Sequence, residues 1–258
     1  MKLIKAEYLK LLFTYIKNKK TTLFSLLLLV IIIGITLNIY ENRFHDLDEI
    51  SSIILGTIFL IRIMLSGLMF PISQLAEDIN RNSLDNIMAI SNYNLENQVL
   101  IRSVFSSIFN VFIALFFIFL INLIAPVSLD KNLNLYIMLL VIGIIGSFSV
   151  IGLGFIMASI VWKFNIKLPI VILSQILLTL LIFATPFESF LIPFSNTKLF
   201  VINLFDGYTP NFVFFIKHCI IVLVNSIFYL LLGYLFFKFT RINIIQNKIK
   251  GWNDQNDN

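Results

Sequence analysis

The sequence predicts an all-α integral membrane protein with six transmembrane helices. Of its 258 residues, 59% are hydrophobic and 13% are charged, whereas a soluble domain carries about 25% charged residues. Six apolar stretches reach the length of roughly 17–25 residues that crosses a bilayer. Lysine and arginine gather at alternate ends of these stretches, as the positive-inside rule expects. We therefore expect one transmembrane domain over residues 1–258 that lies in a lipid bilayer, and we do not interpret the net charge of +5 as a sign of nucleic-acid binding.

The expected spans are almost free of charge. Five contain no charged residue, and the second contains only Arg62. The spans cover residues 21–40, 50–76, 103–129, 132–162, 168–187 and 219–237. The first is not a cleaved signal peptide, because residues 37–40 offer no small-x-small cleavage site.

The charge distribution predicts the orientation of these spans. Of the 19 lysines and arginines, 14 flank the spans on the side that carries both termini and four flank them on the other side. The remaining one is Arg62. Since basic residues are retained in the cytoplasm, we expect a multi-pass protein with both termini cytoplasmic.

Residues 2–17 form an expected amphipathic helix before the first span. Apolar side chains recur at helical spacing from Ile4 to Tyr15, and Glu7, Lys10 and Lys17 lie on the opposite face. Such a helix can lie in the headgroup plane with its lysines toward anionic lipid. It is interpreted either as an ordinary positive-inside anchor or as an elbow helix that also touches a cytoplasmic partner.

The run Gln74–Gln98 is polar, although hydrophobic sequence surrounds it, and it is longer than a connection between two spans requires. We call it the polar loop. Ser83 is a suitable N-cap for one short helix, and Asn94 can cap a second helix that starts at Leu95 and leads into the third span. In the first of these helices, apolar side chains occur at helical spacing at Leu84, Ile87 and Met88. A cytoplasmic docking helix and a helix that lies on lipid headgroups both fit this pattern.

Residues 186–211 are rich in Phe, Leu and Ile, but Pro193 and the turn at 206–211 interrupt them. Two short helices that dip into the outer leaflet and an interfacial loop both remain open as interpretations. In the fourth span, small residues recur from Gly143 to Ser159, which predicts close helix packing within the chain.

The chain lacks several chemical signatures. None of its ten glycines begins a Gly-Lys-Ser/Thr phosphate-binding sequence, and no HExxH zinc motif occurs. We therefore expect no catalytic residue, no metal and no cofactor in this chain. Arg62 is a candidate for the translocation path because an intramembrane charge is a functional candidate by default. Alternatively, it is structural, and satisfied by Asn110, Asn122 or Gln175 on neighbouring helices or by water.

Two segments carry a family resemblance. The opening LIKAEYLKLLFTYIKNKK matches an Ala-Glu-x-x-Lys start at Ala6, Glu7 and Lys10, and the polar loop matches at Glu77, Ser83, Leu84 and Ile87. Asn82 replaces a glycine of the family pattern and Ser91 stands where it has a proline. With six spans around these segments, the whole chain resembles the ABC-2 family of ATP-binding-cassette transporter permeases, in particular the short bacterial members of the type V exporter kind.

The resemblance implies roles for these segments. Residues 77–90 would be the coupling helix that docks on a separate ATPase, residues 2–17 the connecting helix, and residues 186–211 the outer re-entrant segment. The coupling residues would be Glu77, Asp78, Arg81, Ser83, Leu84, Ile87 and Met88. Two ATPase copies, which bind ATP and Mg, and a second permease chain, the same or homologous, would complete the exporter.

The substrate is less defined by these patterns. The Ile-, Asn-, Lys- and Phe-rich composition is typical of a low-GC Gram-positive bacterium, where similar permeases export peptide toxins or confer lantibiotic immunity. An apolar interior with one positive charge favours an amphipathic peptide taken from the cell membrane. The alternatives are an exporter of drugs or lipid-linked substrates and, from another class, a secondary carrier or a membrane scaffold. A carrier would be expected to show an intramembrane acid or an inverted repeat.

Overall fold

The computed structural model of the chain is helical throughout the secondary structure that it describes. The described residues are 55–64, 66–68, 71–72, 95–124, 133–164, 166, 168–184, 191–205 and 210–256. They form helix α5 (Leu95–Ile124), α6 (Leu133–Phe164), α7 (Leu168–Ala184), α8 (Ser195–Phe205) and α9 (Phe212–Asn256). A further apolar helix, Leu55–Leu68, precedes α5.

Three of these helices are long and apolar enough to cross a membrane: Leu95–Leu120, Asn134–Phe164 and Phe212–Ile244. They belong to α5, α6 and α9, and they confirm the membrane character of the chain. Two shorter apolar helices, Leu55–Leu68 and Leu173–Ala184, coincide with the second and fifth expected spans. The first expected span, residues 21–40, lies outside the described residues.

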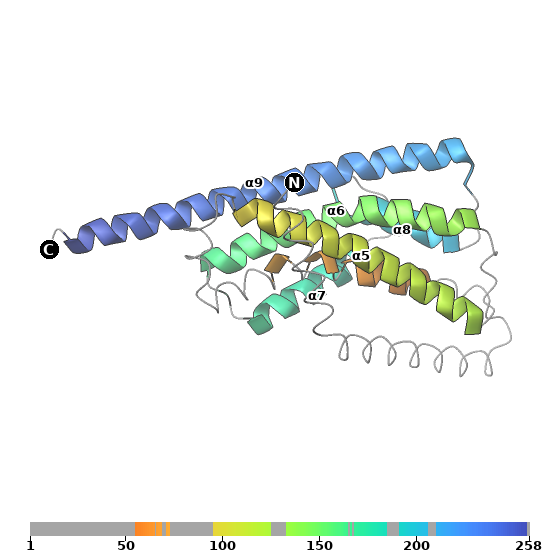
Figure 1. Cartoon of the computed structure of the whole chain (residues 1–258), viewed down its shortest axis with the longest axis horizontal. Helices are drawn as coiled ribbons and strands as arrows, with labels where there is room; N and C mark the ends of the chain where they lie inside the picture. The colour runs from red at the N-terminus through yellow and green to blue at the C-terminus, as the bar shows by residue number, and fades with distance from the viewer. Residues whose placement is uncertain are drawn as a thin grey trace.

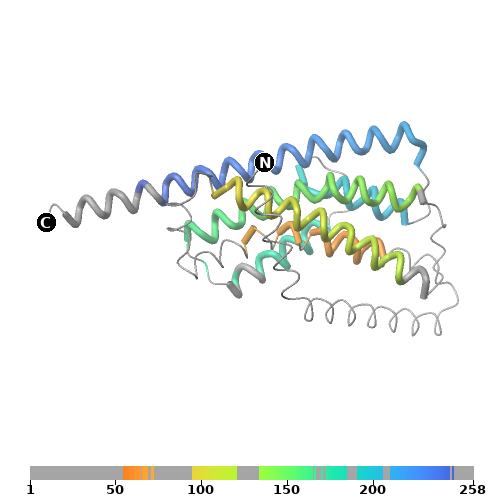
Figure 2. Tube along the Cα trace, viewed as in Figure 1, coloured from red at the N-terminus to blue at the C-terminus, as the bar shows by residue number. Residues whose placement is uncertain are grey.

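The helices form an elongated bundle with α6 at its centre (Figure 1). In the most apolar part of α6, 61% of the residues are buried, against 28% in α9. Helix α9 extends past the rest of the bundle (Figure 1). Figure 2 shows the coloured part of α9 running along one side of α6. We call the end where α5 begins and α6 ends the loop end, and the opposite end the α8 end.

Small residues explain why α6 and α9 lie so close. A Cβ added to Gly152 would stand 2.2 Å from the carbonyl oxygen of Tyr229, and one added to Gly233 would stand 2.1 Å from the carbonyl oxygen of Gly152. The two backbones are therefore in direct contact. Gly143 and Gly146 also face side chains of this chain, Phe59 and Thr197 among them. For these three glycines of α6, the expected packing within the chain is confirmed.

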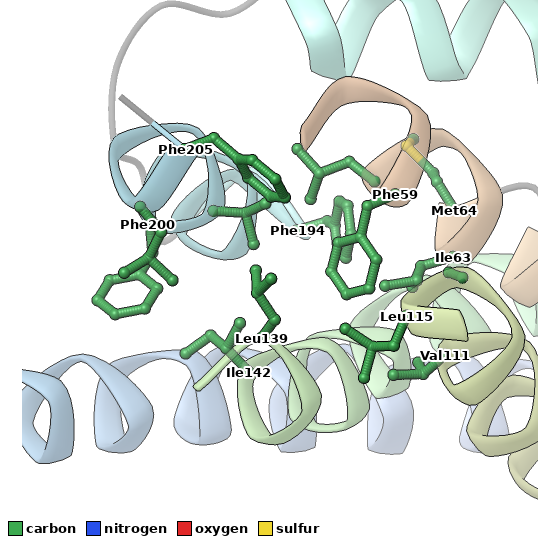
Figure 3. Close-up of a cluster of buried hydrophobic side chains, with 14 of the residues drawn as sticks. Phe59, Ile63, Met64, Val111, Leu115, Leu139, Ile142, Phe194, Phe200 and Phe205 are labelled. Carbon is green, nitrogen blue, oxygen red and sulfur yellow. The ribbon is translucent and has the colours of Figure 1, made fainter. Parts of the chain in front are cut away.

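Most of the core lies toward the α8 end. Phe59 and Ile63, Leu115 of α5, Leu139 of α6 and Phe194 point into one space between the elements (Figure 3). Phe194 has a φ of 67°, in the left-handed region that non-glycine residues rarely adopt. Its carbonyl accepts the first backbone hydrogen bond of α8, from Lys198 N at 2.9 Å. The turn after Pro193 thus fixes where α8 starts and turns the Phe194 ring into the core.

The helix boundaries differ from the expected ones at several points. Helix α5 begins at Leu95, as the sequence predicts for the second helix of the polar loop, and continues without a break to Ile124. Helix α9 begins seven residues before the expected span and continues past Phe237 to Asn256. Within residues 186–211, the described part contains a turn at 191–194 and the helix α8. A second short helix there stays a prediction.

Candidate functional site

Most residues singled out from the sequence lie outside the described part of the chain. These are Glu7, Lys10 and Lys17 of the expected connecting helix, and Glu77, Asp78, Arg81, Ser83, Leu84, Ile87 and Met88 of the expected coupling helix. The structure does describe Arg62 and the residues next to both ends of the polar loop. The candidate site is therefore built from the positions where the loop joins the bundle.

The two ends of the polar loop meet in one buried apolar cluster, which we call the loop base. Ile72 lies just before the loop, and Leu95 and Val99 lie at its end; they are 2%, 2% and 0% exposed. Phe155 of α6 and Phe237 of α9 complete the contact. Leu95 and Val99 are four residues apart and therefore share one face of α5. A segment that enters and leaves the bundle at one place is attached there to both α6 and α9.

Aromatic packing holds α9 in the loop base. The Phe237 ring is fully buried and meets Phe155 edge to face, with the ring centroids 5.3 Å apart. Trp162 of α6 also lies against the Phe237 ring, with the centroids 5.6 Å apart. Edge-to-face and tilted ring pairs contribute about 0.5–1.5 kcal/mol beyond the area that they bury.

A buried ion pair joins the first turn of α5 to α9 beside this cluster. Arg241 Nη2 lies 3.2 Å from Glu96 Oε1, and the two side chains are 17% and 0% exposed. Glu96 also lies in the first turn of α5, where the helix dipole stabilises a negative charge. No hydrogen bond to either carboxylate oxygen occurs among the described residues, so Arg241 is the main counter-charge that this part of the chain supplies.

A neutral hydrogen bond lies next to the ion pair. Tyr234 Oη donates to Asn97 Oδ1 at 2.7 Å. Tyr234, Phe237 and Arg241 are spaced i, i+3 and i+7, so one face of α9 presents a phenol, a ring and a guanidinium toward α5 and α6. We call the Glu96–Arg241 and Asn97–Tyr234 contacts together the α5–α9 link.

Arg62 lies in the middle of the apolar helix Leu55–Leu68. Its guanidinium carbon is 5.4 Å from the centroid of the Phe117 ring of α5, a cation–π geometry. The amide nitrogen of Asn110 donates to the carbonyl and hydroxyl oxygens of Ser106 within α5. Gln175 Oε1 accepts no hydrogen bond within the described structure, and the side chain of Asn122 is not described. The structure thus places Arg62 against an aromatic side chain of α5, Phe117, which the sequence did not predict as its partner.

A buried lysine marks the α8 end. Lys198 is 2% exposed, and its Nζ donates to the carbonyl oxygens of Ile182 at 3.1 Å and Phe183 at 3.3 Å. These carbonyls end α7 and have no partner within that helix, so the lysine caps it. Burial lowers the pKa of Lys198 from its ordinary value of 10.5.

The His218 ring of α9 packs against α8. Its ring is 5.0 Å from Phe200 of α8 and 4.7 Å from Phe214, one turn earlier on α9. Phe200 also meets Phe215, at 5.8 Å. Because α9 begins at Phe212, His218 lies inside the helix and joins α9 to α8. The described residues contain no group of three His, Cys, Asp or Glu side chains able to hold a metal ion.

Several residues of this arrangement were not singled out from the sequence. In the sequence, Glu96 resembles any acidic residue in the first turn of a helix. Arg241 resembles any basic residue at a cytoplasmic membrane edge, and Lys198 resembles any charged residue in a loop. Their partners lie far away in the sequence or are backbone carbonyls, so spacing cannot reveal them. A weak signal existed for α9, because Tyr234 and Arg241 fall on one face at helical spacing.

The fold and the apolar helices define this chain as a helical membrane protein with a long polar loop anchored at one end of its bundle. Comparisons with protein-family models, with curated proteins and with solved structures find no match.

Proposed function

We propose that the chain is the transmembrane permease subunit of an ABC exporter that a separate cytoplasmic ATPase drives. The observation that carries the proposal is the loop base. The polar loop is long, starts beside Ile72, ends beside Leu95, and joins the bundle where α6 and α9 are both within contact. A protein that binds the loop can thereby move all three long apolar helices that the structure describes.

The proposal includes the full architecture of the resemblance. Six spans would cross the bacterial cell membrane, with both termini in the cytoplasm; the three long helices and the two shorter apolar helices support five of these positions. Two permease chains, identical or homologous, would assemble with two ATPases. ATP and Mg would be bound by the ATPases, while this chain would contribute the coupling helix at residues 77–90 and the connecting helix at residues 2–17.

We further propose that the substrate is amphipathic or hydrophobic, in particular a peptide that leaves the membrane. Large apolar side chains cover the outward faces of α5, α7 and α9; Phe116, Leu181 and Val213 are 58%, 62% and 74% exposed. Such surfaces suit contact with lipid or with a lipid-dissolved substrate. Arg62, over Phe117 in the bundle, supplies a positive charge that can meet a carboxylate.

The coupling role is tested by replacing Leu84 and Ile87 with aspartate in the full chain, co-expressed and purified with an ABC ATPase of the same genome. Apolar side chains that dock into a groove lose that contact when they become charged. We expect ATPase stimulation by the permease to disappear while membrane insertion persists. Asn86→Asp, which adds a charge to the polar side of the same segment, is the matched control. Unchanged stimulation in the double variant would count against docking through residues 77–90.

The path role of Arg62 is tested by Arg62→Leu and Arg62→Lys at matched expression. The probe is an amphipathic helical peptide with a free C-terminal carboxylate, compared with its C-terminally amidated form. Lysine keeps the charge but lacks the planar guanidinium that stacks on Phe117. We expect export of the free-acid peptide to fall in both variants, and most strongly in the leucine variant. Full export in both would remove Arg62 from the path.

A further inference from the structure

The α5–α9 link lies at the point where the polar loop becomes helix α5. Glu96 and Asn97 are the second and third residues of α5 and belong to the last part of the polar loop, which is helical from Leu95. Each makes a polar contact with α9, at Arg241 and Tyr234 respectively. Both contacts with α9 are made within the first turn of α5. A displacement of this end of the loop therefore acts directly on α9.

The link fixes the register of the two helices. Tyr234 and Arg241 lie seven residues apart, or about 10 Å along α9 at 1.5 Å per residue. A slip of one turn would move each of them by about 5.4 Å and break both contacts at once. The carboxylate of Glu96 is fully buried, and a buried charge without its counter-charge is unfavourable. The two helices are therefore expected to move together at the loop end.

Helix α9 is also in close contact with α6. The backbones touch where Gly152 meets Tyr229 and where Gly233 meets Gly152, next to the link residue Tyr234. These contacts are made by backbone atoms, so no side chain can change its rotamer to let the helices shift. We call α6 and α9 together the α6–α9 pair, since neither can move far without the other in this packing.

The same pair holds α8 at the opposite end. Thr197 of α8 packs on Gly146 of α6, where an added Cβ would stand 2.3 Å from Thr197 Oγ1. Phe200 of α8 meets Phe215 and His218 of α9. From Arg241 to His218 the distance along the helix is about 35 Å, which is more than the hydrocarbon thickness of a bilayer. Figure 1 shows α8 beside the first turns of α9, far from the start of α5.

We infer that the α5–α9 link connects the polar loop to the α6–α9 pair, and that this pair carries movements of the loop to α8 at the other end of the bundle. The inference deepens the proposed function. It rests on that proposal because the proposed ATPase is what moves the loop. Glu96, Asn97, Tyr234 and Arg241 act as positioning residues, and α8 with its Lys198 cap on α7 is the element that responds.

The test measures backbone hydrogen exchange in the purified complete chain in lipid nanodiscs, without an ATPase. Tyr234→Phe removes one hydrogen bond and keeps the shape of the ring, and Glu96→Gln removes the charge. If the α6–α9 pair carries movements from the link to α8, opening at the link loosens the contacts of the pair with α8. Amides 197–205 of α8 then exchange roughly tenfold faster in both variants. Glu96→Arg with Arg241→Glu restores the ion pair and should restore protection of α8.

Two matched controls separate transmission from local damage. Thr240→Val and Ser103→Ala each remove a buried hydroxyl that bonds only within its own helix, to Phe236 O and Val99 O respectively, and should leave α8 unchanged. Faster exchange confined to the start of α5 and to residues 230–245 of α9 would overturn the inference. If Glu96→Gln does not fold, Tyr234→Phe decides the outcome.

Failure of the proposed function has a different signature. If the wild-type chain stimulates no ATPase but α8 responds to Tyr234→Phe, the link transmits and the exporter proposal is wrong. If stimulation is present and α8 does not respond, the exporter proposal stands and the route through the α6–α9 pair is wrong.

Discussion

The backbone contact of α6 with α9 at Gly152 provides a sharp prediction. A Cβ added to Gly152 would lie 2.2 Å from the Tyr229 carbonyl oxygen, 2.4 Å from its carbonyl carbon and 2.7 Å from the nitrogen of Leu230. All three are backbone atoms of α9. Gly152→Ala therefore cannot be accommodated by a change of rotamer, and α6 and α9 must separate.

The size of the effect follows from the distances. Side-chain Cβ atoms essentially never come within 3.0 Å of another heavy atom, so the helices must move apart by about 0.8 Å, and a gap of this size forfeits a quarter to a half of the dispersion energy of each affected contact. Overpacking usually costs about 1–3 kcal/mol, and we expect about 3 kcal/mol because backbone is the obstacle. The better helix propensity of alanine returns at most about 1 kcal/mol. The net expectation is a loss of about 2 kcal/mol in the free energy of unfolding.

Unfolding in mixed micelles, followed by circular dichroism and by tryptophan fluorescence, measures this loss. Trp162 lies against Phe237 in the loop base and reports the separation of α6 from α9. Gly143→Ala is the control, because its Cβ would meet only the ends of side chains, Phe59 Cζ at 3.0 Å and Ile63 Cδ1 at 3.2 Å. Its cost should stay below about 1 kcal/mol. Equal stabilities of the two variants would refute the argument that backbone contact joins the helices.

Three further predictions concern the ends of the bundle. Removing Arg241 (Arg241→Met) should lower the free energy of unfolding by about 3 kcal/mol, while the combination with Glu96→Leu should recover most of this loss; no recovery would show that the ion pair is not the cause. Lys198→Met leaves the Ile182 and Phe183 carbonyls without their donor and should cost about 1–2 kcal/mol, measured in the same assay against Lys217→Met, an exposed lysine. Because burial lowers the pKa of Lys198 below 10.5, the unfolded chain binds this proton more tightly, so the stability of the wild type relative to Lys198→Met should increase as the pH rises toward 10.5 and then stay constant. The opposite trend with pH would contradict the burial of this amine.

Hydropathy and spacing predicted the elements whose signals are local. The start of α5 at Leu95 was predicted because Asn94 can cap a helix that leads into the third expected span, and the helix begins there. The interruption at Pro193 was predicted for the same kind of reason, and α8 starts two residues later. The small residues of α6 predicted close packing because their size alone decides how near a neighbour can come.

The extent of α9 could not be predicted from hydropathy. The apolar stretch ends at Phe237, where Lys238 begins a polar tail, but polarity does not end a helix. No proline follows, and the helix continues through Arg241 to Asn256. Arg241 thereby stays in register with Tyr234 and reaches Glu96, a pairing across 145 positions of sequence that only the packing of α9 on α5 and α6 creates.

Two sets of polar contacts between elements lie at opposite ends of the bundle. The α5–α9 link is at the loop end and the Lys198 cap is at the α8 end, while glycine backbones fill the contact between α6 and α9 where they cross. Near either end a charge can draw on interfacial water and headgroups, but in the middle of a span an arginine costs about 2.5–3.5 kcal/mol on insertion scales. The Phe117 contact of Arg62 returns about 0.5–2 kcal/mol, so this contact alone does not offset the position of the charge. That difference is the physical reason to test Arg62 with both leucine and lysine: leucine removes the cost together with the charge, and lysine keeps both but loses the planar group that stacks on the ring.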